Sequence, residues 1–208
     1  MEIYTPADRS TFEALMTVAS GRHGPEAQTA REHTRHLPGG FLDRLAHPAD
    51  ATYFLDHTAR WWRKNSDDID WDLPRGEIPS DVLARLREVR DAVQALADGD
   101  RAGYLRRLRA LAARYSFTIR VPEGGLRAQR TGWDGFVGSL VPPLAELGDR
   151  ADRLRRCANE RCQWMFLDMA RNGTRTWCHA SLCGNKFRVR RFRQRARAKA
   201  DAKRSRRG

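Results

Sequence analysis

The sequence lacks several features that mark common classes of protein. No apolar run approaches the roughly 18 residues that a membrane-spanning helix needs, and no basic stretch precedes an apolar segment near the N-terminus. We therefore expect no membrane partner, no secretory signal and a cytoplasmic location. P-loop, GxGxxG, GxSxG and HExxH motifs are also absent, so we do not expect an enzyme, although a catalytic cluster assembled only by folding would leave no such motif.

Acidic residues are scarce near the C-terminus. The chain of 208 residues has a formal net charge of +13, and residues 186–208 hold 12 Lys or Arg and a single acid, Asp201, which amounts to +11. The rest of the chain is therefore nearly neutral. Such asymmetry favours a polyanionic partner, although a solubilising disordered tail has the same composition.

Helical periodicity dominates the first 155 residues. Apolar residues recur at helical spacing in 12–19, 53–61, 82–96, 105–112 and 133–155, and a short helix is expected at 41–46. The pair Pro142-Pro143 should kink or restart the last of these helices. Residues 116–131 instead combine β-branched residues with a PEGG turn, which predicts a hairpin. The predicted fold is therefore mainly α with one small β-hairpin.

Cysteine is also rare, and all four cysteines lie within 27 residues, in the pattern C-x4-C-x15-C-x4-C formed by Cys157, Cys162, Cys178 and Cys183. Two local pairs of thiols are typical of structural zinc sites. A redox site or a buried cysteine cluster remains an alternative, whereas disulfides do not suit a reducing compartment.

One zinc ion would explain how so small a segment folds. Zinc ligation contributes about 10–16 kcal/mol of apparent free energy in small modules, and four protein ligands leave no open position for catalysis. Trp164, Phe166 and Trp177 are the expected core of this module. Arg171-Asn172-Gly173 predicts a turn, and Arg171 and Arg175 flank a loop that can approach phosphate.

The run from Arg156 to Arg195 resembles the CGNR-type zinc finger. The resemblance rests on the four cysteines and on Phe166, Asp168, Arg171, Asn172, Arg175, Trp177, Gly184 and Asn185. Lys186 stands where that family has the arginine of its name. In the family the finger follows an α-rich domain called ABATE, in stress-induced transcription regulators of bacteria. The resemblance therefore implies regulation and DNA binding.

The segment after Cys183 predicts a basic helix. Val189, Phe192, Ala196 and Ala200 form a narrow apolar stripe that can pack on the finger or the body. The other faces carry the residues that we expect to bind nucleic acid together with Arg171 and Arg175: Lys186, Arg188, Arg190, Arg191, Arg193, Arg195 and Arg197. A helix of this kind fits the major groove of duplex DNA or lies along phosphates.

These observations predict three segments. Residues 1–155 form an α-rich, ABATE-like domain that senses a small-molecule effector or mediates homodimer assembly. Residues 156–197 form the zinc finger with its basic helix, and residues 198–208 form a basic tail. The predicted function is a zinc-dependent, nucleoid-associated transcription regulator that binds duplex DNA. The alternatives are a protein- or RNA-interaction module with nonspecific nucleic-acid binding and an enzyme in the N-terminal domain.

Overall fold

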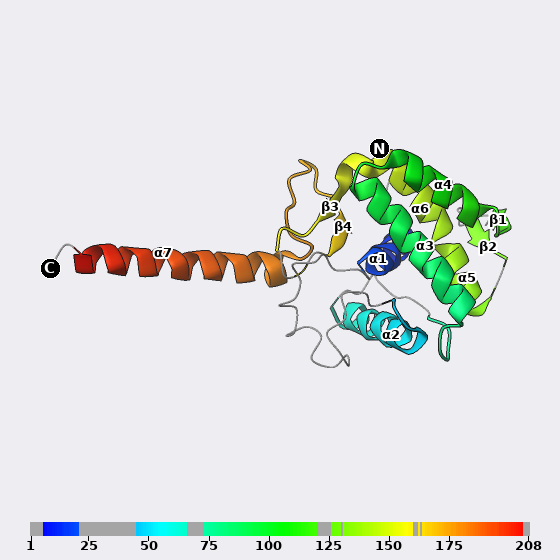
Figure 1. Ribbon diagram of the computed structural model, residues 1–208, viewed down its shortest axis with the longest axis horizontal. Coiled ribbons are helices and arrows are strands. Elements are labelled where there is room, and N and C mark those ends of the chain that lie inside the picture. Colours follow the sequence, from blue (N-terminus) through cyan, green and yellow to red (C-terminus); the bar gives the residue numbers. More distant parts are fainter. Residues whose placement is uncertain are drawn as a thin grey trace.

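The computed structural model describes residues 6–20, 45–65, 73–119, 126–129, 131–159, 162 and 164–205. The elements in chain order are the helices α1 (Pro6–Ala19), α2 (Pro48–Asn65), α3 (Ser80–Ala97) and α4 (Arg101–Ala112), the strands β1 (Phe117–Ile119) and β2 (Leu126–Ala128), the helices α5 (Gly132–Ser139) and α6 (Val141–Leu147), the 3-10 helix η2 (Gly148–Arg153), the strands β3 (Leu154–Arg156) and β4 (Met165–Leu167), the π-helical turn η3 (Ala180–Gly184) and the helix α7 (Asn185–Ser205). The predicted mainly helical fold is confirmed. Figure 1 shows packed helices on one side and α7 projecting away from them on the other.

The core of the body forms around α3. This helix packs along α4 and against α1, and its apolar positions, among them Leu86, Val89 and Val93, are buried as their helical period predicts. In the view of Figure 1, α2 lies beneath α1 and α3. None of the described helices combines the length and the hydrophobicity that a bilayer-spanning segment requires.

A tight turn joins α3 to α4. Gly99 adopts a φ of 83°, a left-handed conformation that other residues rarely adopt. The Asp100 carboxylate accepts a hydrogen bond from the backbone N–H of Gly103 at 2.8 Å and so caps α4. One turn later the Tyr104 hydroxyl donates to the carbonyl of Leu144 at 2.6 Å, which ties α4 to α6.

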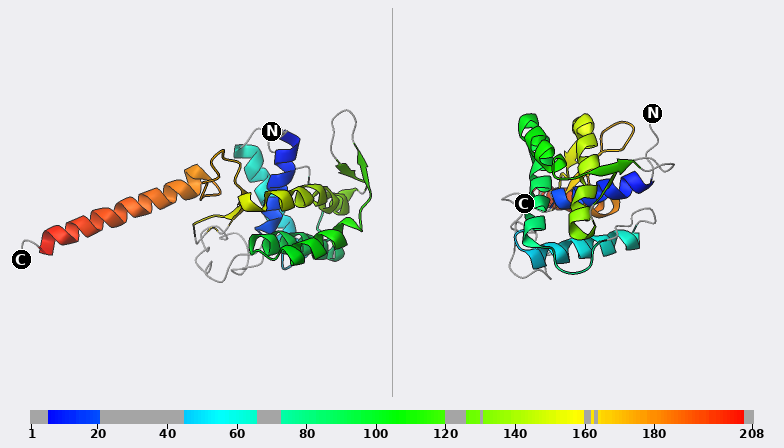
Figure 2. Two further views of the ribbon diagram at one scale, coloured as in Figure 1. Left: turned by 90° about the horizontal axis from the view of Figure 1, so that it is seen from above. Right: turned by 90° about the vertical axis from the view of Figure 1, so that its right-hand side faces the viewer.

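The hairpin expected in residues 116–131 is present. β1 and β2 pair antiparallel with Phe117 opposite Ala128, and β2 packs on α5. The right-hand view of Figure 2 shows this hairpin lying across the helices of the body. Of the short helix expected at 41–46, only Leu45 and Ala46 are described, and they form a turn and a bend rather than a helix.

The segment 133–155, expected as a kinked helix, is divided further. α5 ends at Ser139 and α6 begins at Val141, with proline in its first turn, where a missing N–H costs nothing. The chain then tightens into η2 and becomes extended at Leu154. The helix predicted for 154–155 is therefore wrong. Leu154 has the apolar character of a helix face, but it pairs in a strand instead.

A second antiparallel pair, which the sequence did not predict, begins the cysteine segment. In this pair Leu154 of β3 lies opposite Leu167 of β4, and both side chains join the hydrophobic core of the body together with Met165. The backbone N–H of Met165 donates to the Ser20 hydroxyl, just after α1, at 2.8 Å. The strand pair is thus built into the body, and β3 crosses the boundary expected between residues 155 and 156.

Candidate metal centre and basic helix

The four cysteines converge on one point beside the β3–β4 pair. Cys157 directly follows β3, Cys162 lies between the two strands, Cys178 precedes η3 and Cys183 lies within it. All four sulfur atoms lie within 4.8 Å of one another, with 3.6 Å between Cys162 and Cys178 and 3.7 Å between Cys178 and Cys183. None of the four forms a disulfide.

These distances fit a tetrahedral zinc ion. A zinc–sulfur bond is about 2.3 Å long, so the edges of a regular tetrahedron of sulfur atoms measure about 3.8 Å. Cys157 and Cys183 are buried, with 1% and 6% of their surfaces exposed, which shields their side of the site from water, whereas Cys162 and Cys178 are half-buried. The cluster is therefore consistent with one structural zinc, and four protein ligands leave no position for a substrate.

The thiols perturb one another strongly because their sulfur atoms are in contact. Hydrogen bonds from Cys162 and Cys178 lower the pKa of Cys157 to about 7. Contacts led by Cys157 lower the pKa of Cys183 as well, whereas they raise the pKa of Cys162 and of Cys178. Four thiolates this close repel one another. A dication bound by all four offsets that repulsion, which is the chemistry zinc supplies.

Backbone hydrogen bonds hold the ligand loops in place. The N–H of Cys157 donates to the carbonyl of Trp164 at 2.8 Å, and the N–H of Cys162 donates to the carbonyl of Asn159 at 2.7 Å. The N–H of Cys183 donates to the carbonyl of His179 at 3.0 Å. The positions of the thiols are therefore fixed by the local fold as well as by a metal.

The aromatic core expected for the finger is confirmed. Phe166 is 3% exposed and lies in one cluster with Cys157 and Cys183, and Trp164 and Trp177 pack on that cluster. Phe166 alternates along β4 with Met165 and Leu167, which face the core of the body. The short strand therefore joins two hydrophobic cores.

Asp168 holds the loop that separates the two pairs of cysteines. Its carboxylate, 1% exposed, accepts hydrogen bonds from the backbone N–H of Ala170 and from that of Arg175, both at 2.9 Å. No role of its own was expected for Asp168. The signal was its place within the family pattern, directly after the apolar strand.

Arg175 makes contacts that the sequence did not anticipate. Its Nε donates to the carbonyl of Trp177 at 2.8 Å, one of its terminal amino groups donates to the carbonyl of Cys178, and its guanidinium lies 4.9 Å from the centre of the Phe166 ring. These contacts brace the third cysteine. The phosphate contact expected of Arg175 stays a prediction, for which its guanidinium retains the N–H groups that these two bonds do not use.

The predicted turn at 171–173 is present at the surface. Gly173 adopts a φ of 60°, and a Cβ there would lie 2.7 Å from a guanidinium nitrogen of Arg153. That guanidinium donates to the carbonyl of Ala170 at 3.0 Å, which links the turn to the end of η2. Arg171 lies at the exposed tip, where it is accessible to a phosphate.

An aromatic contact joins the finger to α7. The rings of Trp177 and Phe187 lie 4.7 Å apart at an interplanar angle of 37°. A Cβ on Gly184 would lie 3.2 Å from the Trp177 ring, so the small residue after the last cysteine allows this close approach. The first turn of α7 is therefore held against the finger on one side.

The rest of α7 is exposed. All of its side chains from Asn185 to Ala198 are exposed, including the seven Lys and Arg residues expected to bind nucleic acid. The apolar stripe, expected to pack on the finger or the body, is exposed too: Val189 is 40% exposed and Phe192 is 74% exposed. The stripe remains uncovered because α7 continues directly from η3 and then projects away from the body.

The finger contacts the body at the surface as well as in the core. The Arg156 guanidinium lies 2.9 Å from the Asp98 carboxylate, at the turn after α3. The ring of His179, beside Cys178, lies 5.8 Å from that of Trp61 on α2 in an edge-on arrangement. These contacts join residues far apart in the sequence, and no local pattern could have revealed them.

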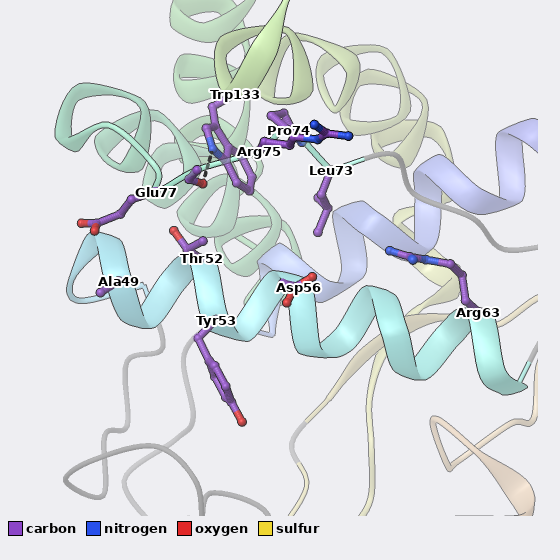
Figure 3. Close-up of a pocket in the computed structure, with 11 residues that line it drawn as sticks. Ala49, Thr52, Tyr53, Asp56, Arg63, Leu73, Pro74, Arg75, Glu77 and Trp133 are labelled. Carbon is purple, nitrogen blue, oxygen red and sulfur yellow. Dashed lines mark hydrogen bonds between the residues drawn. The ribbon is translucent and has the colours of Figure 1, made fainter.

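The body contains a cavity of about 930 Å³ between α2 and residues 73–77, lined at one side by Trp133. Figure 3 shows Glu77 at one end and Arg63 at the other, with the indole nitrogen of Trp133 donating to the carbonyl of Gly76, at 3.0 Å. Asp56 lies between them and forms an ion pair with Arg60 on the same helix. The charged side chains are thus spread along the cavity.

A tetrathiolate cluster on a strand pair, followed by a helix, defines a structural zinc finger. The family model of the CGNR zinc finger matches residues 153–196. This part of the chain is therefore a CGNR zinc finger, as the resemblance implied, and the match begins within η2, before the boundary expected from the sequence. The ABATE domain expected before it was not detected by the family models. A search of the curated proteins found no match.

Proposed function

We propose that the protein is a zinc-dependent transcription regulator that binds duplex DNA through α7 and the adjoining finger. The observation that carries this proposal is that α7 is held at one end and projects into solvent with seven exposed Lys and Arg side chains. An α-helix with its side chains is about 10–12 Å across, so it fits the major groove of B-DNA, which is about 12 Å wide.

The charge of α7 supplies the affinity in this proposal. Each phosphate that a lysine or arginine neutralises releases condensed counterions, so affinity falls steeply with salt. If about six phosphates are neutralised, the logarithm of the binding constant falls with that of the salt concentration at a slope near −5. This term does not depend on the base sequence.

The attachment of α7 supplies the orientation. The ring of Phe187 contacts that of Trp177, which packs on the cysteine cluster, and α7 continues directly from η3, which contains Cys183. A disordered tail of equal charge would bind phosphates without a fixed register. An anchored helix presents the same side chains to the groove each time, which sequence preference requires.

The body then provides regulation in this proposal. It senses a small-molecule effector, for which the cavity between α2 and residues 73–77 offers space, or it mediates homodimer assembly. We propose no catalytic role for it, because Glu77 and Arg63 lie at opposite ends of the cavity and Asp56 is paired with Arg60. The protein would act in the cytoplasm, on the nucleoid.

The test compares the full chain with one that ends at Asn185. Both proteins should bind one zinc and show the circular dichroism of a folded body, but only the full chain should bind duplex DNA. Selection of sites from genomic fragments, with unrelated duplex and structured RNA as competitors, should give duplex sites preferred by orders of magnitude. Equal affinity of the two proteins, or binding to RNA and unrelated duplex as tight as to any selected site, would refute the proposal.

A further inference from the structure

The exposed side chains of α7 are sorted by type around the helix axis. At about 3.6 residues per turn, Val189, Phe192 and Ala196 share one narrow face. The basic side chains form two rows beside that face. One row contains Lys186, Arg190, Arg193 and Arg197, and the other contains Arg188, Arg191 and Arg195.

The apolar face points away from the finger. Phe187, which packs on Trp177, lies on the side of the helix opposite Val189 and Phe192, because five residues correspond to about 140° of rotation and two to about 160°. The finger therefore covers the opposite side of the first turn. Phe192, 74% exposed, stands between the two basic rows and is largely uncovered by the residues that the structure describes.

The two rows determine what can cover this face. A second copy of α7 would bring like charges together along both rows, which is unfavourable. A complementary partner must carry negative charge on two parallel lines with an apolar strip between them. The major groove of duplex DNA has this arrangement, since two phosphate backbones border a floor on which thymine exposes its C5-methyl group.

We propose that Val189, Phe192 and Ala196 are the base-contacting face of α7 and read thymine methyl groups in the major groove, while the two basic rows contact the phosphates on either side. This inference rests on the proposed DNA binding and specifies it further. It assigns sequence preference to the apolar residues and general affinity to the arginines, and the sites it predicts contain thymine where α7 lies in the groove.

The test uses a site selected by the full-length, zinc-loaded protein, synthesised with single thymines replaced by uracil. Uracil lacks only the methyl group, whose burial corresponds to about a fourfold change in affinity. Wild-type protein should lose about that factor at one or two thymines and nothing at the others. At the thymine that Phe192 contacts, Phe192→Ala should bind the thymine and uracil versions of the site equally, and its affinity for unrelated duplex should be unchanged.

Two control variants make the result specific. Gln194→Ala changes an exposed residue on the opposite side of α7 and should keep the wild-type preference for thymine. Arg193→Gln should weaken binding to selected and unrelated duplex alike and reduce the salt slope by about one. Phe192 is exposed and alanine favours helix, so the replacement should not unfold α7.

The outcomes separate this inference from the function on which it rests. If wild-type protein binds no duplex, the proposed function itself fails. If it binds selected duplex but is indifferent to uracil at every position, or if Phe192→Ala keeps the wild-type thymine preference at every position, this inference fails and DNA binding stands. If sedimentation shows that Phe192→Ala converts a dimer into a monomer, the apolar face is a contact between copies, which also overturns the inference.

Discussion

Replacing Asp168 with alanine should weaken zinc binding although Asp168 is not a ligand. Its buried carboxylate accepts two backbone hydrogen bonds at 2.9 Å, from Ala170 and Arg175. A hydrogen bond to a charged group contributes about 1.5–3 kcal/mol. Both bonds fix the loop that delivers Cys178, so we expect the folded, zinc-binding loop to lose about 3 kcal/mol after partial rehydration of the N–H groups.

A loss of that size corresponds to about a hundredfold weaker zinc affinity, since each 1.4 kcal/mol is a factor of ten. Competition with a chromogenic chelator, on the reduced full-length protein, measures it. Asp168→Asn keeps one acceptor oxygen and should lose about tenfold, between wild type and alanine. Met169→Ala, at the neighbouring position with 54% exposure, is the matched control and should change nothing.

The relative zinc affinities of these variants show whether the Asp168 carboxylate holds the loop. If Asp168→Ala binds zinc within about threefold of wild type, the carboxylate does not hold the loop, and the two hydrogen bonds contribute no net free energy. If Met169→Ala is equally impaired, the loop is sensitive to any change and the effect is not that of the carboxylate.

Three further predictions concern the metal and the body. Cys183→Ser should not retain one zinc per chain by metal analysis, while far-UV circular dichroism shows the body helices intact; a stoichiometric ion would contradict the ligand assignment. Ser20→Ala leaves the N–H of Met165 buried without its acceptor and should lower the free energy of unfolding by about 1–3 kcal/mol in urea; no change would mean that the bond is replaced. Burial raises the pKa of the Tyr104 hydroxyl. The stability that the neutral hydroxyl contributes is therefore present below pH 10 and is lost as the pH rises further. The difference in unfolding free energy between wild type and Tyr104→Phe should shrink at alkaline pH, and a constant difference would contradict this.

Local patterns in the sequence predicted the elements whose cause is local. The period of the apolar residues predicted α3, the PEGG turn predicted the β1–β2 hairpin, and the spacing of the cysteines predicted one tetrathiolate cluster. Each of these depends on residues close together in the chain. The end of the helical region at Leu154 was missed because apolar spacing alone does not distinguish a helix face from a strand that packs on the same core.

Contacts between distant residues could not be predicted in this way. The bond from Met165 to Ser20 spans 145 positions, and the ion pair of Arg156 with Asp98 spans 58. The contacts of Arg175 were missed for another reason. Its charge suggested phosphate, but the backbone carbonyls of Trp177 and Cys178 compete for the same donors, and only the folded loop shows that they lie within reach.

The structure changes the part that zinc plays in the proposed function. The sequence suggested that the metal folds a segment too small to fold alone, but β3 and β4 share the hydrophobic core of the body, so part of the finger is stabilised without it. The metal instead fixes Cys178, just before η3, and Cys183, within η3, which leads directly into α7. Neither the charge of α7 nor its helical propensity depends on zinc. In the proposed function zinc therefore governs the direction in which α7 leaves the body, and through it sequence preference, more than the electrostatic affinity for DNA.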